Sequence, residues 1–245
     1  MRKLFPAVRK FFEDHLISLW VLANIVGMFL ASLNYVGPFQ KLWLETSPFN
    51  QVLVSHLVSI IYAFFFGAVQ AAFFKVINQG GFYIQWVLKT WLAISFVIIF
   101  NVFIFPETIF SWLNPVFVKN ITNYSFMISG LKGIEIYAPR NVFGGILITI
   151  LLVIPQGLIS GVVLGFLQKT LIIDRNLAKR WLIYVTIAIT FGLMAYSILA
   201  TSIVSTTHNS FLLHSRLIGS SVIGLSYGIA TRKLVKNFLR VYEYG

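Results

Sequence analysis

Six long runs of apolar residues dominate the chain and leave it few ways to fold. They cover residues 15–37, 51–74, 83–105, 143–167, 181–203 and 215–231. A transmembrane helix needs about 20 mostly apolar residues, and a helix satisfies its own backbone groups in lipid. Only 11% of the residues are charged, and no Asp or Glu lies in any of the six runs. The sequence therefore predicts an all-α integral membrane protein of about six transmembrane helices, with residues 1–245 forming a single transmembrane domain.

Basic residues are distributed unevenly over the segments that connect these runs. Membrane proteins collect Lys and Arg in their cytoplasmic loops. One side holds Arg2, Lys3, Arg9, Lys10, Lys75, Lys169, Arg175, Lys179, Arg180, Arg232, Lys233, Lys236 and Arg240, and the other side holds Lys41, Lys119, Lys132, Arg140 and Arg216. We therefore expect both termini to be cytoplasmic. The same distribution accounts for the net charge of +12 without nucleic-acid binding.

Two segments outside the apolar runs carry apolar residues of their own. The long connection at 106–142 lies on the predicted outer side and is too aromatic for a disordered linker. The C-terminal stretch KLVKNFLRVYEY at 233–244 places Leu234 and Phe238 near one helical face, with basic residues on others. This stretch either lies on the membrane surface or extends the preceding helix.

A short pattern recurs near the ends of three runs and indicates an internal repeat. FFFGAVQAAFFK at 64–75 and GVVLGFLQKTLI at 161–172 each place a glycine three residues before a glutamine. GIATRKLV at 228–235 repeats that spacing with Gly228 and Thr231. The three remaining runs each begin near a tryptophan: Trp20, Trp86 or Trp91, and Trp181. The sequence thus predicts three parallel two-helix repeats, related by an axis along the membrane normal.

Glycines on a four-residue spacing mark the helices that end each repeat. They are Gly67, Gly157, Gly161, Gly165, Gly224 and Gly228. Helices in a bilayer associate through close packing, which small residues permit. We expect these glycines to be helix-packing positions and the three helices to meet at a common contact near the pseudo-axis. The alternative is that the small faces line a pathway.

Three glutamines are the main polar candidates inside the apolar runs. Gln70 and Gln168 lie near the cytoplasmic ends of their helices, on nearly the same face as the glycines. They form either a polar latch between repeats or a polar ring at the mouth of a pathway. Gln156 follows Pro155 in the middle of its run. Because proline removes one helix bond, this position is a second candidate for a pathway.

The chain has few residues of the types that bind metals or carry out catalysis. His56, His208 and His214 belong to the outer half and are candidate ligands for a metal or a pigment. No second group fixes such a site, so no metal or other cofactor is predicted, and pigment or lipid binding stays open. The chain has no Cys and no nucleotide-binding, zinc-protease or serine-hydrolase motif. We therefore expect that it is not an enzyme.

Part of the chain resembles known membrane proteins. The pattern Gly161-x-x-x-Gly165-x-x-Gln168, followed by Lys179-Arg180-Trp181, is similar to that of uncharacterised polytopic membrane proteins from cyanobacteria. The resemblance implies a bacterial inner or thylakoid membrane and carries no known activity. The mitochondrial carriers also have three two-helix repeats. Their Pro-x-Asp/Glu-x-x-Lys/Arg signature is absent from 15–37, 83–105 and 181–203, so we exclude that family.

Three functions remain compatible with these features. The first is a non-enzymatic accessory or assembly subunit that packs against other integral membrane proteins or copies of itself. The second is a channel or facilitator for a neutral or apolar solute, since carboxylates for ion coupling are absent from the apolar runs. The third is a pigment- or lipid-binding membrane subunit.

Overall fold

The computed structural model describes residues 14–33, 48–77, 82–100, 128–130, 133–135, 142–206 and 212–243. Side chains are described at 14–33, 57–76, 82–100, 153–199 and 217–238. Most of the predicted outer loop at 106–142 and the basic N-terminal residues lie outside the described ranges. His208 lies outside them too, and so do the side chains of His56 and His214.

Six helices form the described part of the chain, one for each apolar run. They are α2 (Leu16–Ala31), α4 (Pro48–Ile77), α5 (Tyr83–Ile99), α8 (Val142–Lys169), α9 (Arg175–Thr206) and α10 (Leu212–Glu243). Two three-residue strands, β1 (Ile128–Gly130) and β2 (Gly133–Glu135), pair antiparallel with Gly130 opposite Gly133. The prediction of a mainly helical fold with six helices is confirmed.

The helices differ in whether their length and composition suffice to cross a membrane. Among the described residues, two segments are long and apolar enough to cross one, Leu57–Val76 and Arg175–Leu199. Three further apolar helices are shorter: Leu16–Ala31, Tyr83–Ile99 and Val153–Lys169.

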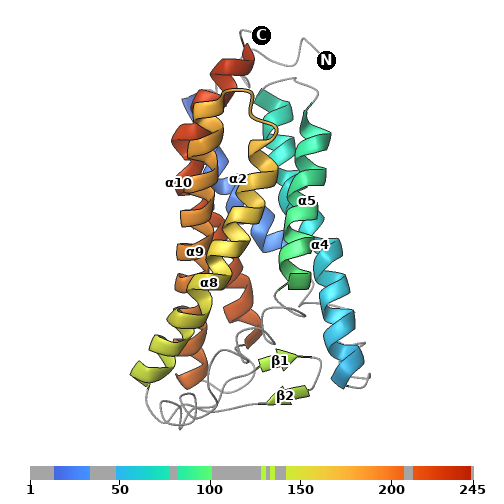
Figure 1. Cartoon of the computed structure of the whole chain (residues 1–245), viewed down its shortest axis with the longest axis vertical. Coiled ribbons are helices and arrows are strands. Elements are labelled where there is room, and N and C mark those ends of the chain that lie inside the picture. The colour runs from blue at the N-terminus through green and yellow to red at the C-terminus, as the bar shows by residue number, and fades with distance from the viewer. Residues whose placement is uncertain are drawn as a thin grey trace.

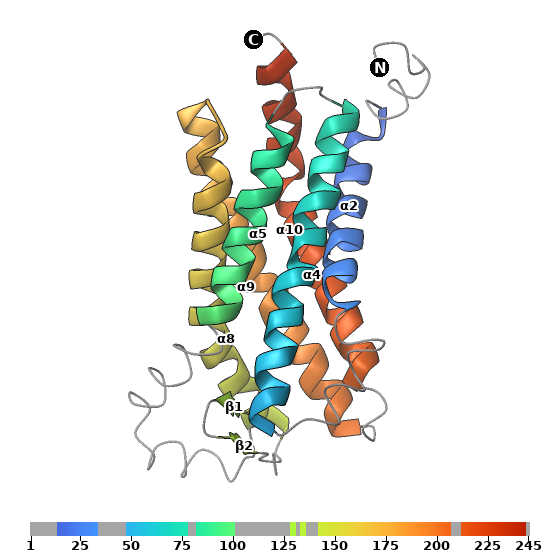
Figure 2. The same ribbon diagram turned by 90° about the vertical axis from the view of Figure 1, so that its right-hand side faces the viewer.

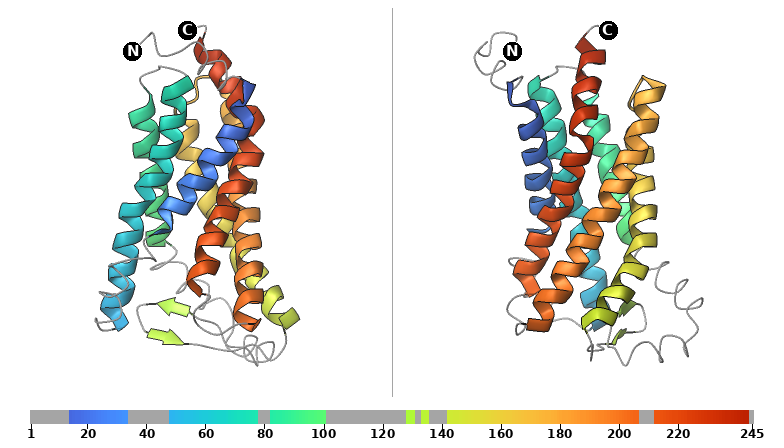
Figure 3. Two further views of the ribbon diagram at one scale, coloured as in Figure 1. Left: turned by 180° about the vertical axis from the view of Figure 1, so that it is seen from behind. Right: turned by 90° about the vertical axis from the view of Figure 1, so that its left-hand side faces the viewer.

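The helices run up and down beside one another, as Figures 1 and 2 show, and the order in which they pack closes into a ring. The main packing pairs are α2 with α4, α4 with α5, α5 with α8, α8 with α9, α9 with α10, and α10 with α2. The first and last helices of the described chain therefore lie side by side, which Figure 3 shows from behind. The start of α2 and the end of α10 lie at the same end of the bundle (Figure 1).

A tight turn joins α8 to α9 at this end. The carboxylate of Asp174 accepts hydrogen bonds from the backbone N–H groups of Asn176 (2.7 Å) and Leu177 (3.0 Å). A carboxylate in this position satisfies N–H groups that have no partner within the helix. The cap therefore fixes where α9 begins, six residues before Trp181.

The C-terminal basic stretch belongs to the bundle and does not lie apart from it. α10 continues without a break to Glu243. Its residues Leu234, Val235 and Phe238 are buried in the core. Of the two alternatives for 233–244, the structure supports an extension of the preceding helix, and part of that extension is core.

The glycine positions also differ from the prediction of one common contact. Gly161 and Gly165 in α8 face α9. A Cβ added at Gly161 would lie 2.5 Å from the Cα of Thr186, and one added at Gly165 would lie 3.2 Å from the Cα of Leu182. Gly228 in α10 faces Val21 of α2 in the same way. None of the pairs α4–α8, α8–α10 and α4–α10 is a main packing pair. Each glycine stripe therefore packs against the neighbouring helix around the ring, and the stripes do not meet at the axis.

Candidate functional site: a buried polar ring

Three tryptophans near the starts of helices make the same kind of bond to the neighbouring helix. Each donates its indole N–H to a polar side chain in the C-terminal half of that neighbour. The pairs are Trp86 of α5 to Gln70 of α4 (2.9 Å), Trp181 of α9 to Gln168 of α8 (3.1 Å) and Trp20 of α2 to Thr231 of α10 (2.8 Å). The same contact thus recurs three times around the bundle.

The amide groups of the two glutamines make a second set of bonds. Gln70 Nε2 donates to Asn24 Oδ1 over 2.6 Å, and Gln168 Nε2 donates to Thr90 Oγ1 over 3.0 Å. Asn24 lies four residues after Trp20, and Thr90 lies four residues after Trp86. The equivalent third position, four residues after Trp181, is Val185. An apolar residue fits there because the hydroxyl of Thr231 donates within its own helix, to the Tyr227 carbonyl at 2.7 Å.

Tyr227 joins these pairs into a closed circuit of hydrogen bonds. Its hydroxyl donates to Gln168 Oε1 over 2.7 Å, and Gln168 Nε2 reaches Gln70 Oε1 at 3.5 Å. The circuit returns through Asn24, whose Nδ2 donates to the Trp20 carbonyl at 2.8 Å, and through Thr231 back to Tyr227. We call the nine participating residues the polar ring: Trp20, Asn24, Gln70, Trp86, Thr90, Gln168, Trp181, Tyr227 and Thr231.

Every member of the polar ring has 0% of its surface exposed. A buried amide is costly unless both its ends are bonded, and both glutamines meet that condition. The ring contains no charged side chain. It therefore ties α2, α4, α5, α8, α9 and α10 together with neutral hydrogen bonds.

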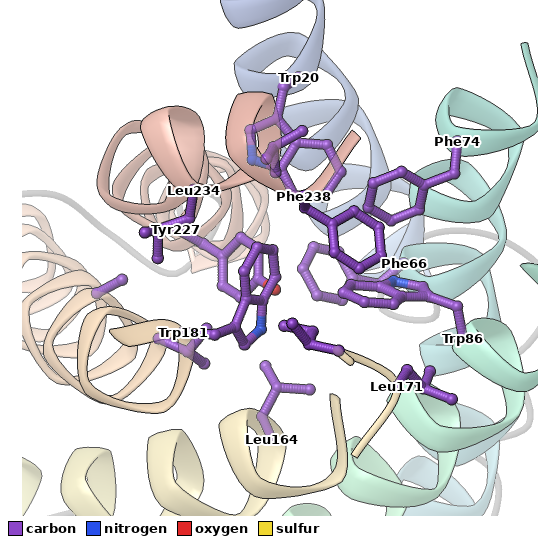
Figure 4. Packing of buried hydrophobic residues seen from close by; sticks show 14 of the residues in the cluster. Trp20, Phe66, Phe74, Trp86, Leu164, Leu171, Trp181, Tyr227, Leu234 and Phe238 are labelled. Carbon is purple, nitrogen blue, oxygen red and sulfur yellow. The ribbon is translucent and has the colours of Figure 1, made fainter. Parts of the chain in front are cut away.

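An aromatic layer covers the polar ring toward the chain termini. The ring of Phe238 lies 5.4 Å from that of Phe74, 5.3 Å from Phe82 and 6.1 Å from Trp86, between centroids. Figure 4 shows the labelled side chains pointing from several helices into one shared space. The described side chains thus fill the bundle centre at this level.

Glycine lets the helices approach closely enough for these bonds. In α4, α8 and α10 a glycine stands three residues before the ring residue, as Gly67, Gly165 and Gly228. Each faces the residue that follows a ring tryptophan: Val87, Leu182 and Val21 respectively. One or two turns earlier in α8 and α10, Gly157 faces Thr190 and Gly224 faces the Asn24 backbone. All six predicted glycines therefore stand at helix contacts.

Gln156 lies apart from the polar ring. It is half-buried on α8, about three helical turns from Gln168. α8 remains one helix through Pro155. The structure therefore brings Gln70 and Gln168 together and leaves Gln156 elsewhere.

Sequence reasoning missed three members of the ring: Asn24, Thr90 and Tyr227. A signal for the first two was present, because a polar residue stands four positions after Trp20 and after Trp86. The sequence left open whether Trp86 or Trp91 is the repeat tryptophan of α5. Trp86 belongs to the ring, whereas Trp91 donates to the Ile60 carbonyl of α4 over 2.7 Å.

None of the nine polar-ring residues is a His, Cys, Asp or Glu. No group of three His, Cys, Asp or Glu side chains suited to a metal occurs in the described part of the chain. Comparison with models of protein families, with curated proteins and with solved structures found no match. The site is a set of neutral side chains that satisfy one another's hydrogen bonds and join six helices at one level of the bundle.

Proposed function

We propose that the chain is an integral membrane protein that crosses the bilayer six times. The observation that carries this proposal is the reversal of polarity between its inside and its outside. All six helices expose large apolar side chains, among them Leu22, Ile61, Leu92, Phe166, Phe191 and Ile218, while the polar ring is buried. Exposed apolar area of this extent is costly in water and favourable in lipid. The longest helices have 32 residues, or about 48 Å at 1.5 Å per residue, more than a bilayer core requires.

The charge pattern supports an orientation with both termini in the cytoplasm. The bacterial inner or thylakoid membrane is proposed from the resemblance carried by Gly161, Gly165 and Gln168. Basic residues gather at the end of the bundle near the polar ring: Lys75, Lys169, Arg175, Lys179, Arg180, Arg232, Lys233 and Lys236. The positive-inside rule places this end on the cytoplasmic side.

Cysteine labelling tests the orientation directly, because the chain contains no cysteine. Arg175→Cys should react with a membrane-impermeant maleimide only in inverted vesicles, and Lys132→Cys only in right-side-out cells. Phe191→Cys, on the apolar outer face of α9, should react from neither side. A protein released from membranes by alkaline wash contradicts the membrane location itself.

The threefold recurrence of contacts supports an origin in three two-helix repeats, α2–α4, α5–α8 and α9–α10. Counted from each ring tryptophan, position +7 is Gly27, Ala93 and Ala188, and all three are buried. Counted from Gln70, Gln168 and Thr231, position +3 is Phe73, Leu171 and Leu234, again all buried. Burial and hydrogen bonding thus follow one pattern in each pair of helices.

We further propose that the protein acts as a non-enzymatic accessory subunit that packs against other membrane proteins or copies of itself. The polar ring uses its hydrogen-bonding groups internally, so the outer apolar faces are the main surface left for contacts. A photo-crosslinking residue at Phe191, which is 63% exposed, or at Ile61, which is 64% exposed, should form protein adducts in native membranes. The same residue at buried Val185 is the control. Adducts with lipid alone at both exposed positions contradict the accessory role.

A channel or facilitator for a small neutral solute is the second candidate, and two serines favour it. The hydroxyls of Ser95 in α5 and Ser160 in α8 are buried and have no hydrogen-bond partner among the described residues. Such groups are commonly satisfied by internal water. Liposomes that contain the purified protein separate the two candidates. A scaffold leaves the flux of water and glycerol unchanged, whereas a channel raises it, and Ser160→Ala should then alter that flux.

A further inference from the structure

A surface cavity lies between α9 and α10, next to the polar ring but separate from it. Its volume is about 430 Å³, and three cations line it: Arg180, Arg232 and Lys233. Asn237 adds an amide, and no acidic side chain lines the cavity. Several positive charges around one hollow are the usual environment of a bound anion.

The three cations of this cavity have no partner within the described part of the chain. No hydrogen bond or ion pair engages them there, and all three are exposed. Two other lysines at the same end of the bundle do have partners. Lys75 Nζ lies 5.3 Å from the ring centroid of Tyr83, and Lys169 Nζ lies 4.5 Å from that of Phe166. The cavity cations are therefore available to an external ligand.

The polar ring holds these cations at a fixed level of the bundle. Arg180 directly precedes Trp181, and Arg232 and Lys233 directly follow Thr231. Both neighbours are ring members with 0% exposure. The backbone beneath the charges is thus anchored, which reduces the entropy lost when a ligand binds.

The wall of the cavity that is farther from the basic end has a different character. Tyr184 and Ile229 line it there and are both 45% exposed. Each lies about one helical turn from a cavity cation, on the side away from the chain termini. A charged rim beside an exposed apolar wall matches a ligand with an anionic head and a hydrocarbon tail.

We propose that this cavity binds the phosphate of an anionic phospholipid, with an acyl chain lying along Tyr184 and Ile229. Arg side chains bind phosphate oxygens through paired N–H donors, and Lys233 and Asn237 add further donors. The proposal rests on the membrane location proposed above. It assigns a specific lipid site at the cytoplasmic side, beyond general contact with the bilayer.

The test uses the full-length protein purified in a mild detergent, with phosphatidylglycerol and phosphatidylcholine of identical acyl chains as probes. Native mass spectrometry measures how much lipid is retained, and thermal unfolding measures the protection it gives. The triple variant R180Q/R232Q/K233Q removes the cavity cations. The matched control R175Q/K179Q/K236Q removes three cations from the same end that do not line the cavity. All six positions are exposed, so both variants should fold.

We expect phosphatidylglycerol to bind more tightly than phosphatidylcholine, and the cavity variant to lose affinity by on the order of a hundredfold. The control should lose less than about threefold, because its three exposed charges do not line the cavity and are screened by solvent and salt. Equal losses in the two variants, or equal binding of the two lipids, would overturn the proposal. Protection by inorganic phosphate equal to that by phosphatidylglycerol would also overturn it, since a free anion needs no apolar wall. A protein that leaves the membrane on alkaline washing instead refutes the membrane location, and the two failures are thereby distinguished.

Discussion

The indole N–H of Trp20 donates a hydrogen bond of 2.8 Å to the hydroxyl of Thr231, across 211 residues of chain. This bond joins the first described helix to the last and closes the bundle. It is equivalent to the bond from Trp86 to Gln70 and to the bond from Trp181 to Gln168, which join two other pairs of neighbouring helices. Because all three bonds are fully buried, each should contribute to the stability of the bundle.

Trp20→Phe should destabilise the protein by about 1 kcal/mol, because it keeps an aromatic ring but leaves the Thr231 hydroxyl without its buried donor. Thermal unfolding in detergent measures the change. Trp91→Phe is the matched control. Its acceptor, the Ile60 carbonyl, lies within a helix and retains a partner, so the loss should be smaller. A control variant that loses as much as Trp20→Phe contradicts the importance of the closing bond.

Gln168→Leu should cost more than Trp20→Phe, roughly 3 kcal/mol, because it removes the partners of Trp181, Tyr227 and Thr90 together. Tyr227→Phe alone should cost about 1 kcal/mol. In the Gln168→Leu background the same change should cost nearly nothing, since the tyrosine hydroxyl has already lost its acceptor. This double-mutant cycle isolates the pair. Additive losses would show that the 2.7 Å contact contributes no stability of its own.

The third repeat offers a sharper test of equivalence. Thr231→Gln alone places a longer amide opposite Val185, which cannot accept its N–H. Adding Val185→Thr recreates the combination found at Gln168 and Thr90. The double variant should be more stable than Thr231→Gln by about 1 kcal/mol, the contribution of one buried hydrogen bond. If Val185→Thr gives no recovery, the three positions are not equivalent.

Gly161→Ala should destabilise the bundle by about 1–3 kcal/mol, although alanine is the better helix former. The reason is steric, because a Cβ there would lie 2.5 Å from the Thr186 Cα. Gly165→Ala, one turn along the same helix, is the control. Its closest contact would be 3.1 Å, to a side-chain atom of Leu182 that can move. The order of unfolding temperatures should therefore be wild type, Gly165→Ala, Gly161→Ala.

The sequence predicted the helices well because each lies in a run of apolar residues with few breaks. It also predicted that Gln70, Gln168 and Thr231 are equivalent, because a glycine precedes each at the same spacing. It did not predict their partners, since a hydrogen bond between helices depends on which helices are neighbours. The burial of Phe238 was hidden for another reason. The sequence shows that Phe238 shares a helical face with Leu234, but the burial of this face in the core depends on the placement of Phe74 and Trp86 beside it.

The site in α10 was the hardest to read from sequence. Tyr227 looks like one more aromatic residue in an apolar run, and nothing local to it indicates a bond to α8. Its role depends on Gln168, 59 residues earlier. The C-terminal helix could thus be located from its composition, but its contribution to the polar ring could not.

The bond from Trp20 to Thr231 also has a consequence for how the protein is made. Ribosomes synthesise α2 before α10, so the indole of Trp20 has no acceptor from Thr231 until α10 has been translated. The same delay applies to Gln168, which waits for the hydroxyl of Tyr227. In the membrane location proposed above, a nascent chain truncated before α10 keeps polar groups unpaired in lipid. Such a chain exposes to the membrane's quality-control proteases a feature that only the complete bundle conceals.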